Sequence, residues 1–219
     1  MTHPAALQKL FAWLSPAFPV GAFAWSAGLE TAITETAVTD SASLTNWLEG
    51  SLAHGGLRTD AIFVAHAWRA PDATPLRDLA DLYLALLPAA ERHAETLALG
   101  EAFVRAAAAW QTEPAASLPA ACPYPIALGA LAAAHAIPLE DTLLASLAAA
   151  VQGQISVAVR LVPLGQTAGL KVLAGLEPAI ATLAGAAAIA TLADLGGIAY
   201  AADIAQMRHE TLEPRLFRS

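Results

Sequence analysis

Residues 139–160 read LEDTLLASLAAAVQGQISVAVR, the longest apolar helix that the sequence predicts. Glu140 and Asp141 stand at its start, where the positive end of a helix dipole favours acidic side chains. Residues 142–159 carry no charge, and Pro163 follows shortly after Arg160. The pattern predicts a long apolar helix that ends before this proline.

Helix signals recur along the rest of the chain. Asp40 and Ser41 offer N-cap oxygens, and Thr74-Pro75 reads as a cap followed by proline at the first helical position. We find no run of alternating β-branched residues, which argues against a sheet. The chain is therefore predicted to form one all-α domain over 1–219, a bundle of about ten helices. The further helices are expected near 7–13, 25–35, 41–54, 57–68, 74–87, 90–110, 126–136, 165–176, 178–193 and 203–212, with a proline-rich loop at 112–125.

The composition excludes some classes of function. A net charge of −8 argues against nucleic-acid binding, because phosphate contacts need clustered Lys and Arg. Cys122 is the single cysteine, so no internal disulfide can form and a reducing, cytoplasmic location is expected.

Two uncharged stretches, 142–159 and 178–193, raise the question of membrane insertion. The first contains Gln152 and Gln154, and the second is shorter than the roughly 20 residues that a span needs. Neither is flanked by a Lys/Arg cluster or an aromatic belt. Buried helices or helices at a subunit interface are therefore expected, with an integral membrane protein as the alternative.

The chemistry of common catalytic sites is missing from the sequence. There is no phosphate-binding G-x-x-x-x-G-K-[ST] loop, no G-x-S-x-G and no H-E-x-x-H. No two histidines are spaced three or four residues apart, so the sequence shows no preformed metal cage. We expect no catalytic residue, no cofactor and no stably bound metal ion.

The segment 207–219 has the composition of a docking tail. Arg215 and Arg218 flank Leu216-Phe217, which suggests an apolar anchor, Phe217, between two charged hydrogen-bond donors. The alternative is that the Leu-Phe pair folds back onto its own domain. The other candidate contact residues in the segment are Met207, Arg208, His209 and Glu210.

Two further segments combine rigidity with possible contacts. The stretch 15–30, SPAFPVGAFAWSAGLE, holds two prolines and three aromatic residues, and Ser26 and Glu30 are its candidate partner contacts. Its structural alternative is a rigid turn that packs its own aromatic rings. Arg160 ends the uncharged helix, where it either caps terminal carbonyls or pairs with an acid at an apolar interface.

These segments, in this order, resemble the urease accessory protein UreF family. The stretch 15–30 is similar to that family's S-P-x-x-P-x-G-A-F-x-[YW]-S-x-G-L-E signature, and 207–219 to its M-R-H-E-T…R-L-F-R-S tail. The stretches 92–100, 124–141 and 158–167 also resemble the family, while Ala168 and Leu170 depart from the Asp and Gln common there.

The resemblance implies an all-α assembly factor that is not an enzyme. Such proteins dimerise and bind UreD (also called UreH) and the GTPase UreG, and together they load nickel and a carbamylated lysine into the urease apoprotein. Nickel would be handled by the complex rather than held by this chain. By resemblance, 207–219 would contact UreD/UreH. Residues 139–176 are expected to support self-association, because their alanine and glycine faces permit close approach of a second copy. In a further hypothesis this chain activates the UreG GTPase, with Arg160 or Lys171 as the charged group offered to it.

A different class of function uses four charged residues. In that alternative the chain is a helical enzyme or small-ligand protein whose pocket is lined by Glu30, Arg92, Glu95 and Arg160.

Overall fold

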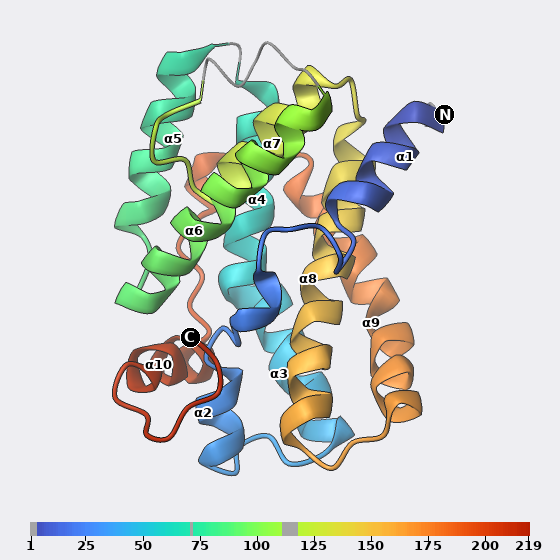
Figure 1. Ribbon diagram of the computed structural model, residues 1–219, viewed down its shortest axis with the longest axis vertical. Coiled ribbons are helices and arrows are strands. Elements are labelled where there is room, and N and C mark those ends of the chain that lie inside the picture. The colour runs from blue at the N-terminus through green and yellow to red at the C-terminus, as the bar shows by residue number, and fades with distance from the viewer. Residues whose placement is uncertain (1–3, 71, 111–117) are drawn as a thin grey trace.

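The computed structural model describes residues 4–70, 72–110 and 118–219, and within them it is all-α, as predicted (Figure 1). Ten α-helices lie in this described part of the chain. They are α1 (Pro4–Trp13), α2 (Leu29–Thr34), α3 (Ser41–His54), α4 (Gly56–Arg69), α5 (Ala73–Ala85), α6 (Ala90–Ala107), α7 (Tyr124–Ala134), α8 (Leu139–Leu161), α9 (Gln166–Ala187) and α10 (Tyr200–His209). Short 3-10 turns occupy Ala22–Ala24, Ala108–Trp110 and Leu192–Asp194.

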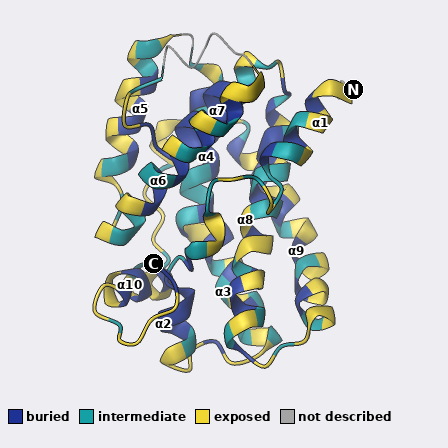
Figure 2. Ribbon diagram, in the orientation of Figure 1, coloured by how far each residue is buried: buried dark blue, intermediate teal, exposed yellow. Residues whose placement is uncertain are grey.

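The centre of the bundle is formed by α4 and α7, which cross in close contact. A helix that is apolar on all sides belongs in the interior, and α7, whose sequence is YPIALGALAAA, is buried from Pro125 to Ala132. Figure 2 shows the buried residues concentrated along α7 and the inward faces of its neighbours. The packing of α3, α6, α8 and α9 around this pair completes one hydrophobic core.

Local sequence signals explain most helix boundaries. The Asp40 carboxylate accepts a hydrogen bond from the Ser43 amide at 2.8 Å, and the Ser43 hydroxyl accepts one from the Asp40 amide, which confirms the predicted cap of α3. The expected cap at Thr74 is wrong. Asp72 caps α5 instead, because its carboxylate reaches the Thr74 amide at 3.0 Å and leaves Thr74 inside the first turn.

Several expected boundaries differ from the structure, and two of the differences have a clear local cause. The predicted break before Pro178 does not occur, and α9 runs through it as one helix, so the proline costs the helix one backbone hydrogen bond without ending it. The helix expected from residue 25 begins at Leu29, because Ala27 and Gly28 have positive φ angles of 52° and 79° that cannot continue a right-handed helix.

By length and composition alone, α8 and α9 are each apolar enough to cross a membrane. In the structure they pack against each other, and both also contact α3 and α4. Their inward residues, such as Leu143, Val151, Leu176 and Ile180, belong to the core. Leu144 and Leu170 remain exposed on the outer side. The apolar sequence of these helices is thus partly explained by burial in the bundle.

Candidate functional site

The stretch 15–30 and the tail 207–219 lie against each other, although they are at opposite ends of the sequence. Figure 1 shows the C-terminal end beside α10 and α2. Gly28 makes possible the close approach of this stretch to α10, the helix that leads into the tail. Its φ is 79°, and a Cβ at this position would lie 2.8 Å from the backbone nitrogen of Gln206 in α10.

Glu30 is the centre of the contact between the two segments. One carboxylate oxygen accepts the Leu216 amide at 2.7 Å, and the other accepts the Phe217 amide at 3.0 Å and lies 2.9 Å from His209 Nε2. Burial alone would raise the pKa of Glu30, but the hydrogen bonds from His209, Leu216 and Phe217 outweigh it and hold the pKa below its ordinary value. Glu30 is therefore a buried anion that binds the tail.

His209 is fully buried between two carboxylates. Its Nδ1 lies 2.7 Å from Glu91, on α6, and its Nε2 faces Glu30. A carboxylate only accepts hydrogen bonds, so both contacts are satisfied when both ring nitrogens carry hydrogen. Arg215 pairs with the second oxygen of Glu91. The end of α10 and the tail are thereby fixed to α2 and α6.

The last residues of the tail pair with the backbone of the 15–30 stretch. The main-chain oxygen of Ser219 accepts the Ser26 amide at 2.9 Å and also the Ser26 hydroxyl. The Arg218 amide donates to the carbonyl of Ala24 at 2.8 Å. The Arg218 guanidinium lies over the Trp25 ring at 4.6 Å, within cation–π distance. Backbone pairing and ring stacking together fix the register of the tail.

Phe217 is a core residue in this structure. It is 3% exposed and belongs to the main hydrophobic core. The Arg160 guanidinium covers its ring at 4.7 Å and also donates to the Phe23 carbonyl. Among the residues that the structure describes, Arg160 thus neither caps its own helix nor pairs with an acid. The expectation of Phe217 as an anchor offered to a partner does not fit this conformation. The alternative, in which the pair folds back, describes Phe217 but not Leu216, which is 77% exposed.

The predicted contact residues therefore separate into two groups. Ser26, Glu30, His209 and Phe217 are buried and build the interface between tail and body. The residues on the outside of the same region, Met207, Arg208, Glu210, Arg215, Leu216 and Arg218, are exposed, as are Arg160 and Lys171 on α8 and α9. Lys171 lies on a different helix from the tail contacts and is not brought together with them.

A second charged network lies behind the tail. Arg92 pairs with Asp60 at 2.5 Å and with Glu95 at 3.3 Å, and the Tyr83 hydroxyl donates to Asp60 at 2.6 Å. Burial raises the pKa of Glu95, and the nearby Arg92 only partly offsets this effect. Ser219 reaches Glu95 at 3.4 Å.

The alternative pocket around Glu30, Arg92, Glu95 and Arg160 is not formed in this conformation. Phe217 and Ser219 occupy the space where these side chains converge. A cavity does lie beside Arg92, but Glu30, Glu95 and Arg160 are not among its lining residues.

Metal-binding groups are not clustered in residues 4–70, 72–110 and 118–219, where we find no set of three or more His, Cys, Asp or Glu side chains placed to hold an ion. Burial raises the pKa of the Cys122 thiol to about 12, so this cysteine is a poor ligand at neutral pH.

Sequence reasoning missed Glu91, Asp60 and Trp25 as parts of this site. Glu91 precedes the recognised stretch 92–100 by one residue, and Asp60 reads as an ordinary polar position of an amphipathic helix. Trp25 lies inside the stretch 15–30, where the sequence indicates no specific contact for its ring. His209 is among the predicted contact residues, but nothing in the sequence shows that its ring is buried between two carboxylates, because histidine spacing carries information about metals and not about carboxylate partners.

Comparison with known proteins identifies the family. A statistical model of the UreF family matches residues 38–177. Over 98% of its length, the chain is 50% identical to a protein named urease accessory protein UreF from Agrobacterium fabrum (strain C58), and the match covers 97% of that relative. The chain belongs to the UreF family. Two further relatives with the same name, from Rhodopseudomonas palustris (strain BisB5) and Bradyrhizobium diazoefficiens, are each 48% identical to it over 98% of its length and 92% of theirs.

Proposed function

We propose that this chain is a urease accessory protein, a scaffold that supports GTP-dependent nickel insertion into the urease apoprotein and catalyses no reaction itself. The observation that carries the proposal is the near full-length similarity to proteins named urease accessory protein UreF. The interlocked 15–30 and 207–219 segments support it, because the two most recognisable family stretches meet in one surface.

The partners in this proposal are UreD (UreH), the GTPase UreG and the urease apoprotein, all in the cytoplasm. The surface offered to UreD/UreH is the outside of the docked tail, with Arg208, Arg215 and the exposed Leu216 at its centre. Because Glu30 and His209 hold this surface in place, the partner meets a preorganised segment and pays little ordering entropy.

A homodimer is proposed through α8 and α9. Their outer faces are rich in alanine and glycine and carry the exposed Leu144 and Leu170, which permits close approach of a second copy. Lys171 is exposed on α9 and would lie near this interface. Alternatively, Lys171 and Arg160 would be the charged groups offered to UreG. No cofactor or resident nickel is assigned to this chain in the proposal.

Reconstitution tests the proposal directly. Urease apoprotein, UreD and UreG are incubated with GTP, bicarbonate and limiting nickel, with and without this chain, and protein-bound nickel and urea hydrolysis are measured. Nickel loading is expected to depend on the chain, and the chain alone should hydrolyse neither urea nor GTP. Equal loading in its absence, or turnover by the isolated chain, would refute the proposal.

A further inference from the structure

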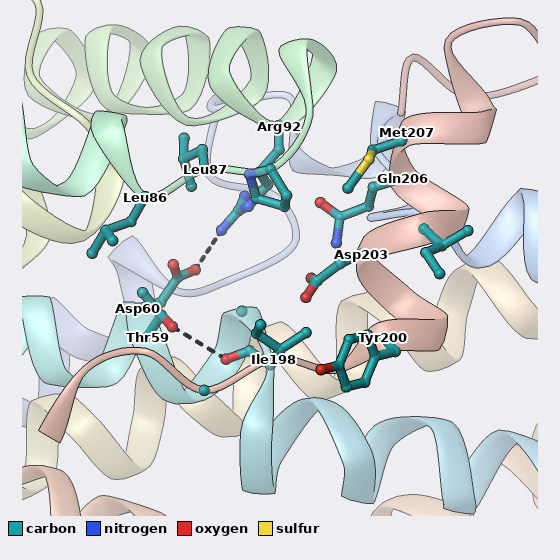
Figure 3. A pocket seen from close by; sticks show the side chains of 15 residues that line it. Thr59, Asp60, Leu86, Leu87, Arg92, Ile198, Tyr200, Asp203, Gln206 and Met207 are labelled. Carbon is teal, nitrogen blue, oxygen red and sulfur yellow. Dashed lines mark hydrogen bonds and ion pairs between the residues drawn. The ribbon is translucent and has the colours of Figure 1, made fainter.

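A cavity of about 370 Å³ lies between the beginning of α4, the α5–α6 connection and α10 (Figure 3). Its floor is the segment before α10, which passes very close to the end of α3. A Cβ on Gly197 would lie 2.5 Å from the carbonyl oxygen of His54, so this close passage requires glycine. The cavity is thus a feature of the backbone arrangement and not of one side-chain rotamer.

Two hydrogen-bond acceptors from α10 face this space. Gln206 is 8% exposed and lines the cavity, and its Oε1 atom is buried without a hydrogen-bond partner in the described part of the chain. Figure 3 shows the Gln206 and Asp203 side chains projecting into the same space, opposite Asp60 and Arg92. A buried acceptor without a donor is costly, and a ligand in the cavity that supplies a donor would remove this cost.

Asp203 adds an uncompensated negative charge. None of the ion pairs between described residues includes it. Burial raises the pKa of Asp203, and a backbone hydrogen bond at Ala199 only partly offsets the effect. The nearby cation, Arg92, is already paired with Asp60 and Glu95. The negative charge of Asp60 and the positive charge of Arg92 cancel, so the charge of Asp203 is the net charge of the residues that line the cavity.

The rim of the cavity is apolar and open to solvent. Leu86, Ile198, Tyr200, Ile204 and Met207 are between 43% and 71% exposed around it. A hydrophobic rim around a small number of acceptors is typical of a surface that takes one polar side chain together with the apolar residues beside it. It suits a protein partner better than a small hydrophilic solute.

We propose that this cavity receives an arginine side chain from a basic face of a protein partner, with the guanidinium held between Asp203 and the Gln206 amide oxygen. A guanidinium has several donors in a planar array and can bond both acceptors at once, and its stem and flat face fit against Tyr200 and the apolar rim. The chain's net charge of −8 favours a basic partner. The proposal adds a contact that is centred on Asp203 and Gln206, with only Met207 of the tail on its rim, and it does not depend on the accessory role.

Peptide titrations of the full-length, ¹⁵N-labelled protein test this inference. The probe is the peptide Ac-Ala-Leu-Arg-Leu-Ala-amide, and its control has citrulline, which keeps the shape and loses the charge, in place of arginine. The arginine peptide should shift the Gln206 side-chain amide and the Gly197 backbone resonances saturably. The citrulline peptide should bind at least about tenfold more weakly.

Matched variants assign the contact. Asp203→Asn should weaken the arginine peptide about tenfold, and Asp81→Asn, at an exposed aspartate of α5 that does not line the cavity, should leave binding unchanged. Gln206→Leu is the second variant and should also weaken the arginine peptide. Because the two peptides are compared on the unmodified chain, that comparison does not depend on whether any variant folds. Equal binding of the two peptides, equal effects of the two aspartate variants, or no shift at all would overturn the proposal. Shifts caused by NiCl₂ but not by the arginine peptide would overturn it in favour of a cation site.

Discussion

The Nε2 atom of His209 lies 2.9 Å from a carboxylate oxygen of Glu30, although the two residues are 179 positions apart in the sequence. The same ring reaches Glu91 through Nδ1. One buried side chain therefore joins α10 to both α2 and α6. As a result, the tail belongs to the folded body in this structure, and its outer residues are presented on a fixed support.

Replacing Glu30 tests whether this carboxylate holds the tail. Glu30→Gln removes the negative charge that faces His209. It also replaces one of the two carboxylate oxygens, which accept the Leu216 and Phe217 amides, with an NH₂ group that cannot accept. We expect a loss of about 2–4 kcal/mol in the free energy of unfolding, measured by urea denaturation, with faster hydrogen exchange at both amides. The control is Glu35→Gln, which breaks an exposed pair with Arg208 and should cost less than about 1 kcal/mol. Equal effects of the two variants would contradict the assignment.

Neighbouring tail residues should behave in opposite ways. Phe217→Ala removes a buried ring and should destabilise the protein by about 3–5 kcal/mol in thermal or chemical unfolding. Leu216→Ala changes a residue that is 77% exposed and should alter stability by no more than about 0.5 kcal/mol. In co-purification with UreD/UreH, Leu216→Ala should nevertheless reduce recovery of the partner. A partner that binds Leu216→Ala as well as the unmodified chain would remove Leu216 from the proposed contact.

Alanine variants of two glycines distinguish the cost of backbone strain from the cost of a steric clash with α10. Gly28 and Gly21 have nearly the same φ, 79° and 77°, but a Cβ on Gly28 would meet Gln206, whereas one on Gly21 meets nothing within 4 Å. Gly21→Ala should cost about 1 kcal/mol from strain alone. Gly28→Ala should cost clearly more and increase hydrogen exchange in α10, which must move away. If the two variants lose the same stability in urea unfolding, the close approach of Gly28 to α10 is wrong.

Acid should release the tail. The pKa of Glu30 is lower in the folded state than its ordinary value of 4.5, so this group stabilises the fold above that pH. Its contribution is lost as pH falls below 4.5 and through the folded pKa. Hydrogen exchange at the Leu216 amide, corrected for its intrinsic pH dependence, should show protection that is constant from pH 7 to about 5 and then declines.

A local probe is needed for this experiment, because burial raises the pKa values of Glu95 and Asp203 and these groups act with the opposite sign on global stability. The Glu30→Gln variant is the control, since its Leu216 amide should lack the acid-dependent step. An acid-dependent step of the same size in that variant would assign the release to another group.

The helices could be predicted from the sequence, because the residues that start and end a helix act locally. The acids before the uncharged stretch 142–159, the Asp40 cap and the glycines after α3 each act within one or two turns. The error at Pro178 has the same origin. Local propensity favours a break, but packing of α9 against α8 and α3 outweighs the loss of one hydrogen bond.

The site was only partly predictable, because its contacts are long-range. The sequence placed Ser26, Glu30 and the tail among the residues of interest, yet it could not show that they bind one another across the whole chain. A Leu-Phe pair between two arginines reads the same whether it docks on a partner or on its own core. For Phe217, the Glu30 carboxylate favours docking on the chain's own core. It accepts the amides of both Leu216 and Phe217, and this pairing directs the Phe217 ring inward.

We propose that this chain assists nickel insertion into urease without catalysing a reaction itself. The most direct test is the nickel content of urease purified from cells that lack this chain, grown in limiting nickel and compared with the same cells expressing it again. The expected result is urease protein that is present but poor in nickel and activity, with both restored by the chain and partly restored by excess nickel. Urease that carries its full nickel content in cells without the chain would contradict this role.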